Sequence, residues 1–278
     1  MTAGGRVVLV ATPIGNLGDL SPRAVEVLAA ADVVACEDTR HTRKLLTHAG
    51  ISPRRLVALH EHNEREQAEC LVAEARAGAV VAVVTDAGTP GISDPGERLV
   101  DVAVREGVTV GIVPGPSAAI AALVVSGLPT GRFCFEGFLP RKGRERAERL
   151  AAIAAEERTT VLFESPHRVA ATLGDLAAAC GPQRRVALAR ELTKLYEEVW
   201  RGTLAGAAEW AGRQAARGEF GVVVEGASRR AAGDDDVDAA LAARLDAGLD
   251  SKTAIAEVAA ELRVPKRQVY AAALRRKR

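Results

Sequence analysis

Short apolar runs alternate with longer amphipathic segments through the first half of the chain. The runs are rich in Val and Ala, whereas the segments between them repeat their apolar positions with a helical period. This alternation is typical of β–α units built around a mostly parallel sheet. We therefore predict helices that separate five strands, at residues 6–11, 32–36, 55–59, 79–85 and 108–113.

The segments between these runs carry helix start signals. Ser21-Pro22 supplies an N-cap residue followed by a proline at the first helical position. Asn63 with Glu66 has the spacing of a capping box, and Asp94-Pro95 suits the N-cap and first position of a later helix. These signals agree with the strand pattern, and together they predict one α/β domain over residues 1–128.

The pattern changes after a stretch rich in Gly and Pro at residues 127–131. The apolar runs that come next follow one another more closely, which suits a mixed or antiparallel sheet. Ser165-Pro166 is expected to cap a helix that runs to Cys180. Residues 129–226 are therefore predicted to form a second α/β domain, with strands at 132–137, 159–163, 185–190, 195–201 and 220–225.

A polar stretch at residues 227–236, which contains three aspartates, is expected to be a linker. Beyond it, three short segments predict helices at 237–248, 251–262 and 265–274. The last of them carries Arg267, Gln268 and Tyr270, an arrangement typical of a helix-turn-helix. Residues 237–278 therefore fit either an auxiliary RNA contact or a plain packing appendage.

Composition narrows the classes of partner. Lys and Arg number 37 against 36 Asp and Glu, so any contact with nucleic acid depends on local patches rather than on a global basic field. An apolar stretch of about 20 residues, as a membrane span requires, is absent from the sequence, as is a secretory signal. We therefore expect no membrane partner. The four cysteines, Cys36, Cys70, Cys134 and Cys180, lie without C-x-x-C spacing, so we also expect a reducing cytoplasm and no zinc site.

Three loops rich in Gly and Pro directly follow predicted strands, at residues 11–20, 86–96 and 113–119. Because the carboxyl ends of parallel strands meet at one edge of a sheet, we expect the loops to converge there around a small molecule. Ordinary tight connections between strand and helix are the alternative. The G-x-G-x-x-G and P-loop patterns are absent, which argues against an NAD enzyme and a P-loop enzyme.

Ionisable clusters also follow predicted strands. Glu37 and Asp38 come after one strand and His60 and Glu61 after the next, which places them at the same edge as the loops. They suit a general base or a substrate contact. The His60-x-His62 spacing has no evident third ligand, so no metal site is predicted. Surface ion pairs are the alternative for these clusters and for those at residues 163–168 and 189–194.

Seven motifs, taken in their order along the chain, resemble those of one family. This family is the bacterial small-subunit ribosomal RNA 2′-O-ribose cytidine methyltransferases, within the tetrapyrrole methylase superfamily. The resemblance covers residue 6 to about residue 226. It rests on Ala-Thr-Pro-Ile-Gly-Asn-Leu-Gly-Asp at 11–19, Glu-Asp-Thr-Arg at 37–40, His-Glu-His-Asn at 60–63, the 86–96 loop, Pro-Gly-Pro-Ser at 114–117, Glu-Ser-Pro-His-Arg at 164–168 and Arg-Glu-Leu-Thr-Lys at 190–194.

The resemblance implies an α/β fold with two α/β domains of the tetrapyrrole methylase type, a class III S-adenosylmethionine-dependent methyltransferase. It implies S-adenosylmethionine as methyl donor in the cleft between the domains, and a homodimer. The implied acceptor is a decoding-centre cytidine of 16S rRNA in the 30S subunit, with no DNA partner. The donor contacts that carry over are Pro13, Ile14, Gly88, Thr89, Pro90, Ile92, Asp94, Ser117, Ala118 and Phe163.

Methyl transfer to a ribose requires a group that accepts a proton, because the hydroxyl is a poor nucleophile with a high pKa. The candidates for this group are Glu37, Asp38, His60, Glu61 and Glu191. Aromatic residues make up only 3% of the chain, so phosphate and shape contacts should dominate RNA binding over stacking. The candidates for phosphate contacts are Arg40, Arg141, Lys142, Arg144, Arg168 and Lys194.

Two alternatives remain open. A small-molecule methyltransferase acting on a tetrapyrrole precursor would share the fold and donor, but would not require the basic loop at residues 141–146. A non-enzymatic ribosome-assembly factor would bind the subunit without affinity for the donor. The basic loop also has a plain alternative, which is a solvated helix start.

Overall fold

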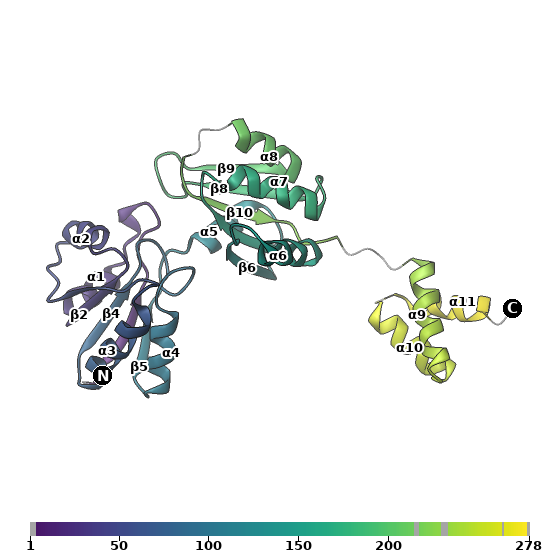
Figure 1. Cartoon of the computed structure of the whole chain (residues 1–278), viewed down its shortest axis with the longest axis horizontal. Helices are drawn as coiled ribbons and strands as arrows, with labels where there is room; N and C mark the ends of the chain where they lie inside the picture. Colours follow the sequence, from purple (N-terminus) through teal and green to yellow (C-terminus); the bar gives the residue numbers. More distant parts are fainter. Residues whose placement is uncertain (1–3, 214–216, 229–232, 263, 277–278) are drawn as a thin grey trace. The chain divides into compact units, whose positions relative to one another are not determined.

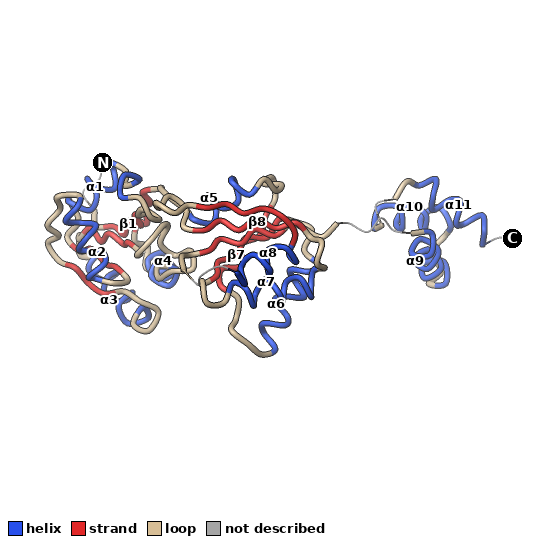
Figure 2. Tube along the Cα trace, turned by 90° about the horizontal axis from the view of Figure 1, so that it is seen from above, coloured by secondary structure: helices blue, strands red, loops and turns tan. Residues whose placement is uncertain are grey.

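The computed structural model describes residues 4–213, 217–228, 233–262 and 264–276. The chain divides into two compact units, residues 1–227 and residues 228–278 (Figure 1). The first unit contains two five-stranded sheets, seen as separate sets of strands in Figure 2. The second unit is helical. Among the described residues, no helix combines the length and the apolar composition that crossing a membrane requires.

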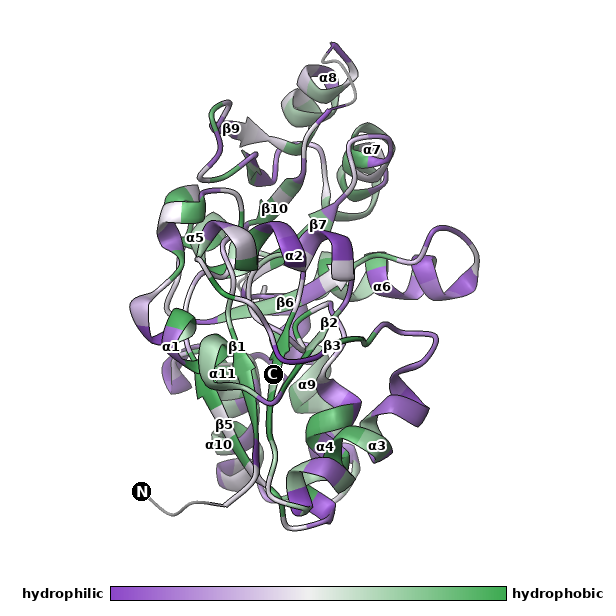
Figure 3. Ribbon diagram, turned by 90° about the vertical axis from the view of Figure 1, so that its left-hand side faces the viewer, coloured by the Kyte–Doolittle hydropathy of each residue, from purple (hydrophilic) through white to green (hydrophobic). Residues whose placement is uncertain are grey.

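The first sheet has the strand order β3-β2-β4-β1-β5. All of its strand pairs are parallel, where the sequence predicted a mostly parallel sheet. Its strands are β1 (Arg6–Val10), β2 (Val33–Cys36), β3 (Leu56–Ala58), β4 (Val80–Val84) and β5 (Thr109–Val113). Helices cover both faces, which explains why the central strands are apolar on both sides. One face packs against α1 (Pro22–Ala30) and α2 (Thr39–His48), and the other against α3 (Glu64–Arg76) and α4 (Glu97–Arg105). Figure 3 shows the contrast between hydrophobic β1 and hydrophilic α2.

The strand order creates a switch point between β1 and β4. These strands are neighbours, yet the chain leaves β1 for β2 on one side and leaves β4 for β5 on the other. The helix that follows β1 packs on one face of the sheet, and the helix that follows β4 packs on the other face. In open α/β sheets, ligands usually bind at the carboxyl ends of the strands beside such a switch point.

The second sheet is mixed, as predicted, with order β6-β7-β10-β8-β9. Only β6 and β7 pair in parallel, and the other pairs are antiparallel. The strands are β6 (Phe133–Phe138), β7 (Thr159–Glu164), β8 (Arg185–Arg190), β9 (Glu198–Thr203) and β10 (Phe220–Val224). One face packs against α6 (Arg144–Ala155), α7 (Val169–Cys180) and α8 (Leu204–Arg213).

The other face of the second sheet packs against α5 (Ala118–Ser126). This helix follows β5 in the chain, and its N-terminal end begins in the third loop rich in Gly and Pro. It therefore joins the loop cluster of the first sheet to the core of the second. Arg201 of β9 holds its other end, because the guanidinium donates to the carbonyls of Val125 and Ser126.

The helix start at Ser21-Pro22 is confirmed, since Ser21 Oγ accepts from the Ala24 amide at 3.1 Å. The start at Asp94-Pro95 is wrong, because α4 begins at Glu97 with Gly96 as its N-cap. Gly96 has no side chain to cap with. Instead, Glu64 Oε1 from α3 accepts from the amides of Gly96 and Arg98, at 2.8 and 3.1 Å.

Two further start signals are corrected by the structure. Helix α7 begins at Val169 rather than at Ser165-Pro166, because the chain first makes a turn in which the Ser165 carbonyl accepts from the amides of Arg168 and Val169. Asn63 is the N-cap residue of α3, but the capping box is wrong. Its side chain bonds backward instead, to the His60 amide and the Ala58 carbonyl.

The start of β9 is also later than predicted. Residues 191–197 form a turn, in which Glu191 and Thr193 have left-handed backbone conformations with φ of 50° and 66°. The strand therefore begins at Glu198 rather than at residue 195.

The second unit consists of α9 (Asp234–Asp246), α10 (Ser251–Glu261) and α11 (Lys266–Arg276) around a small apolar core. Helix α9 begins at Asp234, so the three aspartates form its first turn rather than part of a linker. Carboxylates are favourable there because they complement the positive end of the helix dipole. Residues 229–232 of the expected linker lie outside the described residues.

Candidate active site

The three loops rich in Gly and Pro lie side by side, as the strand order requires. The amide of Thr12 donates to the Gly88 carbonyl at 2.8 Å, and the amide of Gly88 donates back at 3.1 Å. Thr89 Oγ1 donates to the Pro116 carbonyl at 3.2 Å. Gly88 has φ of 85°, a conformation that L side chains rarely adopt. Hydrogen bonds between loops therefore fix the edge of the first sheet.

The loop after β1 also packs tightly against the second sheet's loops. A Cβ on Gly15 would lie 2.4 Å from Lys194 Cγ and 3.0 Å from the Leu192 carbonyl oxygen. Only a glycine permits this approach without a shift of Lys194 and its neighbours.

A pocket of about 340 Å³ lies where the loops meet the second sheet. This volume falls within the range of small-molecule sites. The wall from the loops and α5 consists of Ile14, Ala87, Ser93, Asp94 and Ala118. The wall from the second sheet and its loops consists of Phe138, Phe163, Glu164, Ser165, Pro166, Ala189, Leu192, Glu219, Phe220 and Gly221.

Four of the ten predicted donor contacts line this pocket: Ile14, Asp94, Ala118 and Phe163. The Phe163 ring contacts those of Phe135 and Phe138, at centroid distances of 5.1 and 5.7 Å. The other six lie on the same loops but outside the pocket lining: Pro13, Gly88, Thr89, Pro90, Ile92 and Ser117.

Asp94 is an unusual carboxyl group in this pocket. Burial raises its pKa to about 6, and the negative charges of Glu37 and Asp86 act in the same direction. The pKa of Glu37 is also raised, first by burial and then by Asp86. Thr85 Oγ1 donates to Glu37 Oε2 at 3.4 Å, which partly offsets the shift. The loops after β2 and β4 thus bring three carboxyl groups together beside the pocket.

None of the five candidate bases lines the pocket itself. Asp38 is the N-cap of α2, where the Arg40 amide at 2.7 Å holds its pKa below the usual range. Glu191 accepts from Lys194 Nζ and from the Glu219 amide, both at 2.9 Å. Burial would raise the pKa of Glu191, but these contacts outweigh it and lower the pKa. Asp38 and Glu191 are therefore held as carboxylates in structural contacts.

The two candidates after β3 lie on a more open loop. Glu61 is exposed and lies 3.5 Å from His62 Nε2. The His60 ring lies 6.0 Å from that of His62, and its buried Nδ1 has no hydrogen-bond partner among the described residues. In the described ranges, no group of three His, Cys, Asp or Glu side chains is arranged to hold a metal ion.

The six candidate phosphate contacts divide into exposed cations and cations engaged in the fold. Arg141 and Lys142 lie on the exposed loop between β6 and α6. Arg144 is the first residue of α6, where it is exposed and pairs with Glu148 at 2.6 Å. Arg40 is also exposed and lies 3.8 Å from Asp38. The remaining two are engaged in the fold: Arg168 donates to the Leu139 carbonyl, and Lys194 pairs with Glu191 and Glu219.

The sequence reasoning missed the pocket wall at Phe220 and Gly221. A Cβ on Gly221 would lie 2.8 Å from the Cβ of Ala122, so this glycine lets α5 approach β10. A glycine inside an apolar strand commonly marks such an approach, and it was the available signal.

Comparison with known proteins identifies the class. The profile of the tetrapyrrole (corrin/porphyrin) methylases matches residues 6–208. The solved structure of uroporphyrin-III-C-methyltransferase from Thermus thermophilus is similar, with a TM-score of 0.56 and 25% identity, covering 80% of this chain and 94% of that one. The fold is therefore that of a tetrapyrrole methylase, and the expected fold class is confirmed.

Closer relatives share one name, ribosomal RNA small subunit methyltransferase I. The Synechocystis sp. protein is 46% identical over 269 residues, 96% of each chain. The Mycobacterium tuberculosis protein is 48% identical over 276 residues, 99% of this chain and 96% of its own. The chain belongs to this methyltransferase family within the tetrapyrrole methylases. The resemblance is confirmed, as are methyl transfer as the chemistry and S-adenosylmethionine as the donor.

Proposed function

We propose that this protein transfers a methyl group from S-adenosylmethionine to the 2′-hydroxyl of a decoding-centre cytidine in 16S rRNA of the 30S subunit. The observation that carries the proposal is the pocket where the three loops meet the second sheet. The names of the relatives support small-subunit rRNA as substrate. This substrate also assigns the activity to the cytoplasm.

The pocket suits a nucleoside that carries a positive charge. Ile14, Ala118 and Phe163 offer apolar contacts for a base, and Asp94 offers a carboxylate. A carboxylate in a partly buried site favours a cation strongly, because the effective dielectric constant is lower there than in water. When bound, the donor supplies an electrophilic sulfonium methyl. The residues of the pocket bind the donor, orient it and exclude water.

Glu37 is our preferred base among the five candidates. Its raised pKa makes it a better proton acceptor than Asp38 or Glu191, whose pKa values are lowered by their structural contacts. Its charge also acts on Asp94, which lines the pocket. His60 and Glu61 stay as candidates, because they lie at the same edge of the sheet.

The exposed cations Arg141, Lys142 and Arg144 are proposed to contact phosphates, with Arg40 extending the surface. Arg168 and Lys194, the other two candidates for phosphate contacts, would contribute by holding the fold instead. A homodimer is also proposed. The exposed apolar side chains of Ile112, Ile120 and Val124 on β5 and α5 favour a partner surface there, which light scattering can test.

The test is mass spectrometry of 16S rRNA after incubation of the purified protein with S-adenosylmethionine and 30S subunits from cells that lack it. We expect one added ribose methyl group, and no product from a uroporphyrinogen-type tetrapyrrole. Methylation of the tetrapyrrole alone would favour the small-molecule enzyme. Tight subunit binding without heat of donor binding in calorimetry would favour an assembly factor.

A further inference from the structure

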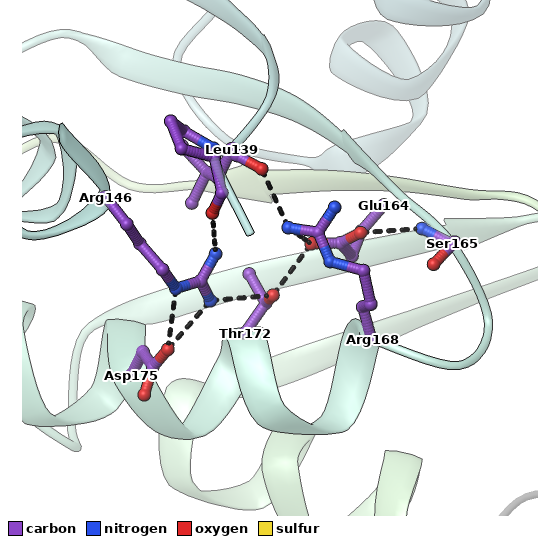
Figure 4. A network of polar contacts seen from close by, with 8 residues as sticks. Leu139, Arg146, Glu164, Ser165, Arg168, Thr172 and Asp175 are labelled. Carbon is purple, nitrogen blue, oxygen red and sulfur yellow. Dashed lines mark hydrogen bonds and ion pairs between the residues drawn. The ribbon is translucent and has the colours of Figure 1, made fainter. Parts of the chain in front are cut away.

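Two arginines hold consecutive backbone carbonyls where the basic loop leaves β6 (Figure 4). Arg168 Nη2 donates to the Leu139 carbonyl at 2.7 Å. Arg146 Nη1 donates to the next carbonyl, that of Pro140, at 2.9 Å. Arg146 is only 9% exposed, although it lies in a basic run. The base of the loop is therefore fixed from inside the domain.

Arg146 makes three further hydrogen bonds inside the same network. Its Nε and Nη2 atoms donate to Asp175 Oδ2 at 3.0 and 2.7 Å. Nη2 also donates to Thr172 Oγ1 at 3.1 Å. All three nitrogens of this guanidinium donate hydrogen bonds within the domain and the residue is buried, so it is a poor ligand for a phosphate. Its role lies in what it holds.

Thr172 connects the two arginines through Glu164. Its hydroxyl accepts from Arg146 and donates to Glu164 Oε2 at 2.7 Å. The Glu164 side chain is fully buried, accepts from the Ser165 amide at 2.8 Å and pairs with Arg168 at 3.4 Å. Figure 4 shows Thr172 between the two guanidinium groups.

This network has one end in the pocket and the other in the loop. Glu164 and Ser165 line the pocket, as does Phe138, which immediately precedes Leu139. Beyond the held carbonyls, Arg141 and Lys142 are exposed, with no ion pair among the described residues. The same buried contacts thus fix both a wall of the pocket and the base of the loop that carries Arg141 and Lys142, here called the cation loop.

We propose that Arg146 and Arg168, joined through Thr172 and Glu164, are positioning residues that set the distance between the cation loop and the methyl-donor pocket. The inference rests on the proposed function. An RNA phosphate held by Arg141 and Lys142 then brings the neighbouring ribose to the donor. A displacement of about 1 Å at a reacting centre can cost roughly a hundredfold in rate.

The test compares T172V with T172S, because valine keeps the shape of threonine without the hydroxyl and serine keeps the hydroxyl. Methylation of 30S subunits is measured as kcat and KM, and donor binding by calorimetry. We expect T172V to lower kcat 10- to 100-fold with donor Kd within twofold, and T172S to keep at least half of kcat. R141A/K142A should instead raise KM and flatten its dependence on salt.

R184Q is the matched control. Arg184 donates to the Ile153 and Ala154 carbonyls at 3.4 and 3.0 Å in the same domain, outside the pocket lining. R184Q should lower the melting temperature without changing kcat. If T172V keeps full kcat, or if kcat falls equally in T172V and R184Q at equal loss of melting temperature, the network merely braces the fold and the inference is overturned.

R146K supplies a second variant in case T172V does not fold. It keeps the charge but loses the planar fork of donors, so kcat should fall at least tenfold with little change in donor Kd. Full kcat in R146K would overturn the inference. Wild-type protein that fails to methylate 30S subunits in this assay would count against the proposed function itself.

Discussion

Asp94 should make donor binding depend on pH between pH 5 and pH 7.5. Its pKa is raised to about 6, so the side chain is almost wholly ionised at pH 7.5, whereas about one molecule in ten is ionised at pH 5. If the carboxylate stabilises the cationic donor, the donor Kd should rise about tenfold as the pH falls from 7.5 to 5. D94N should bind at pH 7.5 about as weakly as the wild type does at pH 5, and without pH dependence.

The same carboxyl group should destabilise the free protein at neutral pH. Its pKa is raised above the ordinary value of 3.8, so its contribution to stability is fully present below pH 4 and is lost as the pH rises through about 6. The shift of about two units corresponds to on the order of 2 kcal/mol in a partly buried site. D94N should therefore be more stable than the wild type at pH 7.5, but not at pH 4.

Calorimetry with S-adenosylmethionine at pH 5, 6 and 7.5 and urea unfolding at pH 4 and 7.5 measure the two effects. S-adenosylhomocysteine, which lacks the sulfonium charge, should show a smaller pH dependence. D32N is the control of opposite sign, because the Val80 amide and then Arg54 lower the pKa of Asp32. The Asp32 carboxylate stabilises the protein at neutral pH, and this effect is lost as the pH falls below about 4. D32N should therefore be less stable than the wild type at pH 7.5. A pH-independent donor Kd together with a D94N protein less stable than the wild type would refute the reasoning.

Two other substitutions test how the loops and the pocket wall are held. E64A should cost about 1–2 kcal/mol of unfolding free energy and weaken donor binding, because Glu64 caps the amides of Gly96 and Arg98 at the end of the 86–96 loop. Urea unfolding measures the stability and calorimetry the donor Kd, and unchanged values would contradict the cap. G221A should cost about 1–3 kcal/mol, because its Cβ would lie 2.8 Å from that of Ala122; a stability equal to that of the wild type in urea would contradict this contact.

The strands, and the gathering of the loops at one edge of the parallel sheet, could be predicted from the sequence. The period of the hydrophobic residues and the turn residues are both local patterns in the sequence. The starts of α4 and α7 could not. Asp94-Pro95 has the local chemistry of a helix start, but Glu64 from α3 caps the helix further along. Such capping depends on tertiary contact, which no local pattern contains.

The loop side of the site could be predicted, and the sheet side only in part. Phe163 was expected in the pocket, but the role of Gly221 depends on α5 crossing to the second sheet. Cations also look alike in a sequence. Only the structure separates the buried Arg146 and the engaged Arg168 from the free Arg141, because burial and partners decide what a charge can bind.

The central claim is that the donor binds where the three loops meet the second sheet. Diffraction from crystals of this protein grown with S-adenosylhomocysteine tests it most directly. The account predicts the nucleoside in contact with Ile14, Ala118 and Phe163, with Asp94 beside it. A nucleoside bound elsewhere, with this pocket closed by the protein's own side chains, would contradict the account.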